Sequence, residues 1–259
     1  LDPAIGHQRR VEAVEPGPFF FGLDHGFEWH DQVLFDQVVG VDREHHGKLR
    51  GLARVERRQR LDAGVVVIAG IDRVDGDVGV LFLEPGDEVV VEAPTFMGAL
   101  GIFRNHGAAV TGVAVDEEGL DVDALADDLA ARAQRGDPQP KLVYTIPDFQ
   151  NPTGVTMATD RRERLLDLAE RYDFVVLEDD PYGRLRYEGS ERPPLKALDV
   201  DDRVIRVNTV SKTIAPGVRT GWILADETTT AQFDRIDAGG EPSFTRGLIE
   251  RYCTDGRLD

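Results

Sequence analysis

A lysine with hydroxyl side chains beside it follows an apolar, strand-like segment. Residues 203–207 form that segment, and the next polar side chains are those of Thr209, Ser211 and Lys212, with Arg219 seven residues after the lysine. Two hydroxyls, an amine and a guanidinium at one strand end can hold a phosphate, because arginine supplies paired hydrogen bonds. A lysine amine so placed can also form a Schiff base. The alternative is a surface lysine in a loop rich in Ser, Pro and Gly.

Three consecutive carboxylates follow a second strand-like segment. Glu178, Asp179 and Asp180 come directly after FVVL, and Tyr182 lies three residues beyond Asp179. Carboxylates at a buried strand end are costly unless each meets a donor or a cation. A protonated pyridine nitrogen would satisfy one of them, and Tyr182 can donate a hydrogen bond to a phenolate oxygen on such a ring. A magnesium site or a solvated acidic turn remain alternatives.

A rigid loop follows a third strand-like segment. The sequence PDFQNPTG places Asn151 among prolines and a glycine, which restrict the backbone and hold the amide in place. A fixed amide suits hydrogen bonding to a planar ligand oxygen. An ordinary turn would use the same residue types, so the loop alone does not decide between the two.

Strands alternate with helices in the part of the chain that carries these sites. The patterns predict strands at 88–93, 141–146, 174–177, 204–207 and 221–225, and helices at 121–135 and 159–172. Helix 121–135 is amphipathic, and Thr159 is expected to cap the second helix. This alternation predicts an α/β fold in which helices cover both faces of a mostly parallel sheet. Ligands bind beyond the carboxyl ends of such strands, where the three sites lie.

The composition excludes several classes of partner. With 48 acidic and 30 basic residues, the formal charge is −18, which disfavours nucleic acid and anionic membranes as partners. Such acidity resembles that of proteins from salt-loving archaea. No apolar run is long enough for a membrane span, and no signal pattern opens the chain, so a cytoplasmic protein is expected. Cys253 is the only cysteine, which excludes disulfides within the chain and cysteine metal clusters, and no metal site is predicted.

Residues 1–80 differ in character from the rest. The stretch 41–62 is dense in Arg and His, and no sustained period appears apart from the apolar run Val65–Ala69. Such charge blocks are typical of a solvated helix face or a disordered tail. A second hypothesis is that part of this segment is translated out of frame or wrongly joined.

The three sites occur together and in a fixed order. The segments PDFQNPTG, LEDDPYG and SKTIAPGVRTGWI resemble the fold-type I aminotransferases of class I/II, which depend on pyridoxal 5'-phosphate (PLP). The similarity is greatest to the branch with 2-aminoadipate and aromatic aminotransferases. It spans residues 81–259, which are therefore expected to form the large, PLP-binding domain of that fold.

The resemblance implies catalytic roles for Lys212, Asp179 and Tyr182, and a cofactor-binding role for Asn151. Lys212 forms the internal aldimine and later moves the proton between the substrate α-carbon and the cofactor. Asp179 pairs with the pyridine nitrogen, and Asn151 and Tyr182 hold the ring oxygen. The implied reaction moves an amino group from an amino acid to a 2-oxo acid in two half-reactions.

It also implies contacts to the rest of the cofactor. Thr209, Ser211 and Arg219 bind the phosphate, and Phe96, in EAPTFMGAL, stacks on the ring, although packing in the core would use the same residue. Members of this family are usually homodimers with a shared active site, so a homodimer is expected.

Two departures from the family pattern stand out. Members carry a Gly-Ser-Gln-type turn that binds the phosphate, whereas residues 69–75 read AGIDRVD, with two aspartates and no hydroxyl. The chain also ends at IERYCTDGRLD, where members continue into a small domain with the arginine that holds the substrate carboxylate. These departures suggest a frameshift or pseudogene lesion in 1–80, an absent C-terminal domain, and an incomplete or inactive form.

Three other functions remain open. A lyase or decarboxylase on the same fold would use the same cofactor residues. A PLP-sensing regulatory domain would predict a basic winged helix-turn-helix before the domain, which residues 1–80 do not show. A non-enzymatic acidic domain would bind a divalent metal at Asp179 and Asp180. Spectral titration with PLP distinguishes the metal-binding domain from the others.

Overall fold

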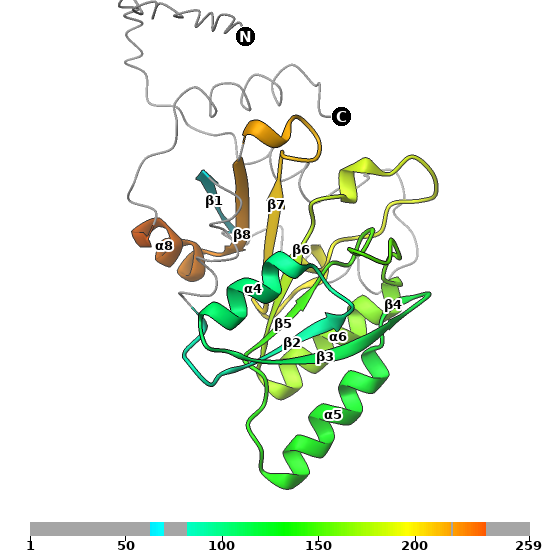
Figure 1. Ribbon diagram of the computed structural model, residues 1–259, viewed down its shortest axis with the longest axis vertical. Coiled ribbons are helices and arrows are strands. Elements are labelled where there is room, and N and C mark those ends of the chain that lie inside the picture. Colours follow the sequence, from blue (N-terminus) through cyan, green and yellow to red (C-terminus); the bar gives the residue numbers. More distant parts are fainter. Residues whose placement is uncertain (1–62, 70–81, 219, 237–259) are drawn as a thin grey trace, which may run out of the picture.

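The computed structural model describes residues 63–69, 82–218 and 220–236 (Figure 1). Strands in this part are β1 Ala63–Ala69, β2 Glu88–Ala93, β3 Ala109–Asp116, β4 Gly119–Leu120, β5 Leu142–Thr145, β6 Val175–Asp179, β7 Val204–Thr209 and β8 Thr220–Asp226. Helices are α4 Met97–Asn105, α5 Val122–Arg135, α6 Thr159–Tyr172, α7 Leu195–Leu198 and α8 Glu227–Ile236, with short 3-10 turns η1 Gly183–Leu185 and η2 Pro216–Val218. The Arg- and His-rich stretch, residues 70–75, Arg219 and Cys253 lie outside the described residues.

The described strands form one sheet in the order β1-β8-β7-β6-β5-β2-β3-β4. Its centre, from β3 through β2, β5 and β6 to β7, is parallel. The strands β4, β8 and β1 join it antiparallel at the two sides. The predicted α/β fold with a mostly parallel sheet is confirmed. β1 belongs to this sheet although it lies within the segment 1–80.

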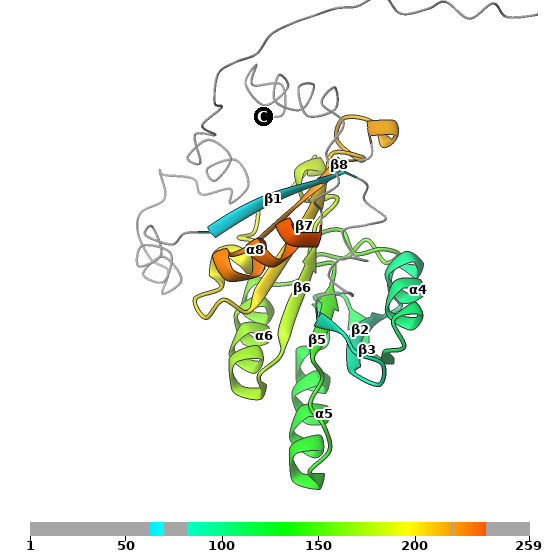
Figure 2. The same ribbon diagram turned by 90° about the vertical axis from the view of Figure 1, so that its left-hand side faces the viewer.

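Helices cover both faces because successive residues of the central strands point to opposite sides. Val89 and Val91 pack with Phe103 of α4 and Phe233 of α8 on one face. Val90 packs on the other face with the apolar stripes of α5 and α6 and with α7. Figure 2 shows α4 across the sheet from α5 and α6. Both faces of the central strands are therefore buried, and the free space for a ligand lies at the strand ends.

The two long helices begin in different ways. Asp121 caps α5, since its carboxylate accepts a hydrogen bond of 2.9 Å from the Ala124 amide. The prediction that Thr159 caps the next helix is wrong, because the cap is Ala158, which has no side-chain acceptor, and Thr159 is already helical. The Ala158 amide donates to the Glu118 carbonyl at 3.0 Å, and this contact holds Ala158 extended. The helix therefore starts one residue earlier than a cap at Thr159 would place it.

Among the helices in the described part of the chain, none is long and apolar enough to cross a lipid bilayer.

Candidate active site

The predicted site residues gather at the carboxyl ends of three neighbouring strands. Asn151 follows β5, Asp179 ends β6 and Thr209 ends β7, and these strands are adjacent and parallel (Figure 1). A direct contact links two of the strand ends, since the Tyr144 hydroxyl of β5 donates to the Asp179 carboxylate at 2.6 Å. The topology thus brings together side chains that are far apart in the sequence.

Two of the three consecutive carboxylates are satisfied by the protein itself. Glu178 is fully buried and accepts hydrogen bonds of 2.9 Å from the amides of Leu195 and Lys196, at the start of α7. Asp180 is also buried and pairs with the guanidinium of Arg206. Because both carboxylates already have donors on neighbouring elements, they serve to hold the fold together at this edge.

Asp179 differs from its two neighbours. Its described hydrogen-bond donor is Tyr144, and within the described ranges no cationic side chain forms an ion pair with it. Burial raises the pKa of the Asp179 carboxyl to about 6, and the nearby Asp180 charge adds to this, whereas the Tyr144 hydroxyl opposes it. A cation arriving at Asp179 would therefore relieve an unfavourable charge.

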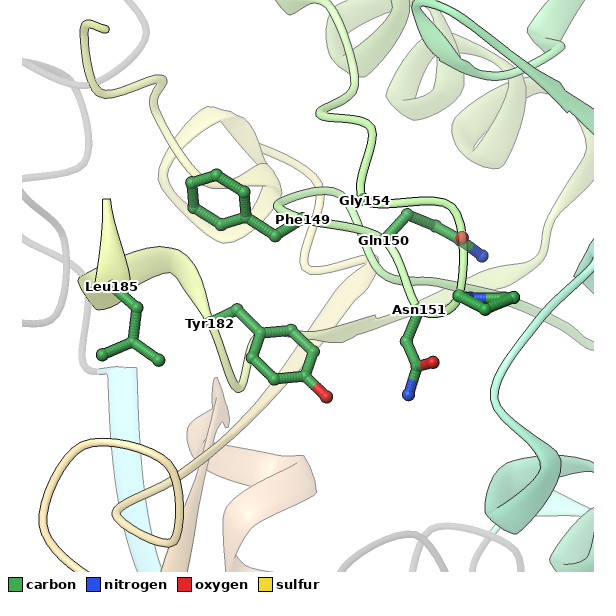
Figure 3. Close-up of a pocket in the computed structure, with 7 residues that line it drawn as sticks. Phe149, Gln150, Asn151, Gly154, Tyr182 and Leu185 are labelled. Atoms are coloured by element: carbon green, nitrogen blue, oxygen red, sulfur yellow. The ribbon is translucent and has the colours of Figure 1, made fainter. Parts of the chain in front are cut away.

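An amine, a phenol and an amide lie near one another at this end of the sheet. The Lys212 side-chain nitrogen lies 5.9 Å from the centre of the Tyr182 ring, and Tyr182 and Asn151 line the same pocket. Burial and the Asp179 charge raise the pKa of the Tyr182 phenol, which therefore stays protonated at neutral pH. Figure 3 shows the Tyr182 hydroxyl and the Asn151 amide pointing toward the same space.

A pocket of about 290 Å³ opens beside these groups. Its lining residues are Phe149, Gln150, Asn151, Pro152, Gly154, Tyr182 and Leu185 (Figure 3). Two aromatic rings and a leucine give it mainly apolar walls, while Asn151 and Tyr182 place polar groups at one side. Apolar walls with a few fixed polar groups are the usual construction of a small-molecule site.

The expected phosphate-binding residues are partly described. The Thr209 hydroxyl accepts a hydrogen bond of 2.9 Å from the Ser211 amide, which fixes the turn before Lys212. The Ser211 hydroxyl is buried and has no hydrogen-bond partner within the described part of the chain. A buried hydroxyl without a partner is costly, so a ligand oxygen at this place would be favourable. Arg219 lies outside the described residues, and its role stays a prediction.

Phe96 occupies the position just before α4. It is 39% exposed, and a methyl group at Gly98 would lie 2.5 Å from two carbons of its ring. The ring therefore covers Gly98, a position where a larger residue would displace it. Phe96 is not among the residues that line the pocket, and its stacking role stays a prediction.

Taken by chemical type, these side chains fit the phosphorylated pyridine ring that the motifs imply. Asp179 is an anion with no cationic partner among the described residues, and Lys212 is an exposed amine beside the pocket. The buried Ser211 hydroxyl has no hydrogen-bond partner in the described part of the chain. The metal alternative has less support, because the described residues include no group of three or more His, Cys, Asp or Glu side chains arranged to hold an ion.

A buried ion network supports the pocket wall, and no sequence pattern indicated it. The Asp148 carboxylate accepts from Arg162 at 3.0 Å and from Arg186 at 2.8 Å, and the Arg162 side chain is completely buried. The Arg186 guanidinium lies 4.6 Å from the centre of the Phe149 ring, which lines the pocket. Phe149 itself has a φ of 51°, which is unfavourable for a large side chain. The network therefore holds the loop after β5 in a conformation it would not adopt alone.

Replacing Asp148 by alanine is expected to lower the free energy of unfolding by about 3–5 kcal/mol, because it leaves buried arginine charge without its partner. Urea unfolding at neutral pH measures this loss. Asp137→Ala is the matched control, since it removes an exposed pair with Arg135 and should cost under about 1 kcal/mol. Equal losses in the two variants would contradict the conclusion that the Asp148 network stabilises the loop after β5.

Comparisons with known proteins agree with this geometry. Residues 48–240 match the family described as aminotransferase class I and II. Aromatic-amino-acid aminotransferase 1 of Thermococcus litoralis is 49% identical over 185 residues, which are 70% of this chain and 44% of that protein. The mitochondrial kynurenine/alpha-aminoadipate aminotransferase of Mus musculus is 36% identical over 153 residues, 57% of this chain and 36% of that protein.

A solved structure gives the same result for the fold. The kynurenine aminotransferase of Pyrococcus horikoshii, crystallised in complex with PMP, aligns with a TM-score of 0.72 at 35% identity, covering 89% of this chain and 61% of that one. The chain spans less than half the length of the two curated relatives above. The family match begins at residue 48, earlier than the motifs indicated, and the family predicted from the motifs is confirmed: the chain belongs to the class I and II aminotransferases.

Proposed function

We propose that this chain is the cofactor-binding part of an aminotransferase that uses PLP to move an amino group from an amino acid to a 2-oxo acid. Membership of the family and the similarity to aminotransferases support this. The observation that carries the proposal is the state of Asp179, a largely buried carboxylate with no cation from the described residues. Its charge acts on Tyr182, which lines the pocket and whose ring lies 5.9 Å from the Lys212 side-chain nitrogen. A ring cation at this place would supply the missing charge.

Bound PLP supplies an electron sink for the pair of electrons left when the α-carbon loses a proton. The chain supplies the groups around it. Asp179 would hold a proton on the ring nitrogen by its negative charge, and Asn151 and Tyr182 would donate hydrogen bonds to the ring oxygen. The Lys212 amine would hold the cofactor, and it would take up and return the proton of the substrate α-carbon. General acid–base transfer of this kind contributes about 10²–10⁴-fold to a rate.

The remaining contacts extend the same proposal. The unpaired Ser211 hydroxyl supports a phosphate position beside it, with Thr209 and Arg219 as the other ligands. Phe96 would turn from Gly98 to stack on the ring. Two further expectations also stay proposals: a homodimer, from the resemblance, and a cytoplasmic location, from the sequence. Light scattering of the purified protein tests whether it is a dimer.

Titration with PLP tests the proposal. Binding should produce a new visible absorbance band, and borohydride reduction followed by peptide mass analysis should find the added mass on Lys212. The apo chain treated with borohydride alone is the control. Absence of both the band and the added mass would overturn the proposal.

Amino-donor screening then separates the functions that share this cofactor. The names of the relatives make aromatic amino acids, kynurenine and 2-aminoadipate the first donors to test. An aminotransferase should yield the 2-oxo acid and the aminated cofactor, whereas a decarboxylase should release carbon dioxide. Colour without any conversion would indicate a chain that binds the cofactor without turning over amino acids, as expected of an incomplete form or a regulatory domain.

A further inference from the structure

A second buried carboxylate lies at the edge of the site, and neither the motifs nor the proposed chemistry uses it. Glu92, near the end of β2, is 1% exposed and accepts three hydrogen bonds. The donors are the Thr145 hydroxyl at 2.6 Å, the Ile146 amide at 3.2 Å and the Gln150 side-chain amide at 2.9 Å. All three belong to β5 or to the loop that follows it. Glu92 therefore fastens the start of that loop to the neighbouring strand.

The side chain of Gln150 connects Glu92 to the residues on either side of Asn151. Its side-chain nitrogen also donates to the Pro94 carbonyl at 2.8 Å. Its side-chain oxygen accepts from the amide and the hydroxyl of Thr153, at 2.9 and 2.7 Å. Asn151 lies between the two residues joined in this way. The side chain of Gln150 is almost completely buried, so water does not compete for these bonds.

We propose that Glu92 is a positioning residue for Asn151, acting through the side chain of Gln150. The inference rests on the proposed function, in which the Asn151 amide binds the ring oxygen. Burial raises the pKa of the Glu92 carboxyl to about 7, and above that pH it suits this task because both of its oxygens accept and neither donates. One oxygen takes the Thr145 hydroxyl, and the other takes both the Ile146 amide and Gln150. Without an acceptor here, the Gln150 amide would lose one of its two partners and could rotate.

Two substitutions separate this role from simple packing. Glu92→Met keeps the length of the side chain but removes both acceptor oxygens. Glu92→Gln keeps one oxygen for the Ile146 amide and Gln150, while its new side-chain amide NH2 faces the Thr145 hydroxyl, which can turn to accept. Glu92→Gln should therefore preserve the position of the loop, whereas Glu92→Met should release it. A role in filling space alone would be served equally by both.

A double-mutant cycle with Asn151→Ala tests the proposal. In the otherwise unchanged chain, Glu92→Met should weaken PLP binding about tenfold, the equivalent of one hydrogen bond to the ligand. In the Asn151→Ala background the same change should have less than about a twofold effect, because the group that it positions is gone. Glu92→Gln should bind within about twofold of the unchanged chain. Hydrogen exchange in the apo chain gives a second reading, since Glu92→Met should speed exchange of the Thr153 amide.

Glu88→Met is the matched control at the opposite end of the same strand. Glu88 also accepts from a threonine, Thr111, and pairs with Arg132, so its loss should lower stability without changing PLP affinity. Should Glu92→Met fail to fold, Gln150→Met enters the same cycle. Failure of the unchanged chain to bind PLP would overturn the proposed function. Binding by the unchanged chain, with equal weakening by Glu92→Met in both backgrounds, would overturn only the positioning role.

Discussion

Lys212→Ala is expected to abolish covalent uptake of PLP and to remove any amino transfer. The chain has four lysines, at positions 48, 141, 196 and 212. Lys196 is buried in a pair with Asp199, and Lys141 pairs with Asp87. Lys48 lies outside the described residues. Lys212 is the exposed amine beside the pocket, so no other described lysine can replace it. The loss of proton transfer alone should slow turnover by about 10²–10⁴-fold.

Reduction with borohydride and peptide mass analysis measures the loss of attachment directly. Lys141→Ala is the matched control, because Lys141 lies at the amino end of β5, away from the site. It should keep both the visible band and the added mass. Covalent attachment that survives in Lys212→Ala and is lost in Lys141→Ala would place the reactive amine elsewhere and refute the proposed site.

Asp179→Asn is expected to weaken PLP binding by about 2–5 kcal/mol, the usual cost of removing one charge of a desolvated pair. The change keeps the size of the side chain and an oxygen for the Tyr144 hydroxyl, so the fold should be little affected. Equilibrium titration followed by absorbance measures the affinity. Tyr144→Phe is a useful companion, since it removes the donor but leaves the charge and should weaken binding far less.

The same carboxylate predicts a pH dependence. The Asp179 carboxyl has its pKa raised to about 6, and only the ionised form can balance a ring cation. PLP affinity should therefore fall as the pH drops below about 6, by up to tenfold per pH unit from this group. Titration of the cofactor phosphate is common to both proteins, so the difference between the unchanged chain and Asp179→Asn isolates the contribution of Asp179. Parallel profiles would contradict its role.

The order of the motifs identified the region of the site. Only the folded structure explains why the three neighbouring carboxylates have different roles. The residues alone left Glu178, Asp179 and Asp180 equivalent, and the resemblance singled out Asp179. The structure supplies a physical reason, because the donors to Glu178 come from α7 and the partner of Asp180 comes from β7. Such partners lie far along the sequence, and no local pattern reveals them.

Elements with strong apolar patterns were predicted to within a few residues, and weaker ones were missed. The strand predicted at 204–207 extends two residues further in the structure, and helix α5 has the predicted end. Helix α4 gave no signal because its nine residues include two glycines, and β3 is only half buried, so its apolar pattern is broken. Glu92 was overlooked because a lone glutamate in an apolar strand has no distinguishing pattern.

The position of β1 in the sheet affects how the chain folds while it is being synthesised. Within the described residues β1 pairs with β8 alone, and Ala63 is opposite Asp226, so its partner leaves the ribosome long after β1 itself. Contacts this distant in sequence slow folding, and until β8 arrives both β1 and the outer side of β7 have unpaired backbone groups. A nascent chain stalled before residue 220 should thus be prone to aggregate, and a chaperone that shields strand edges should raise the yield of folded protein.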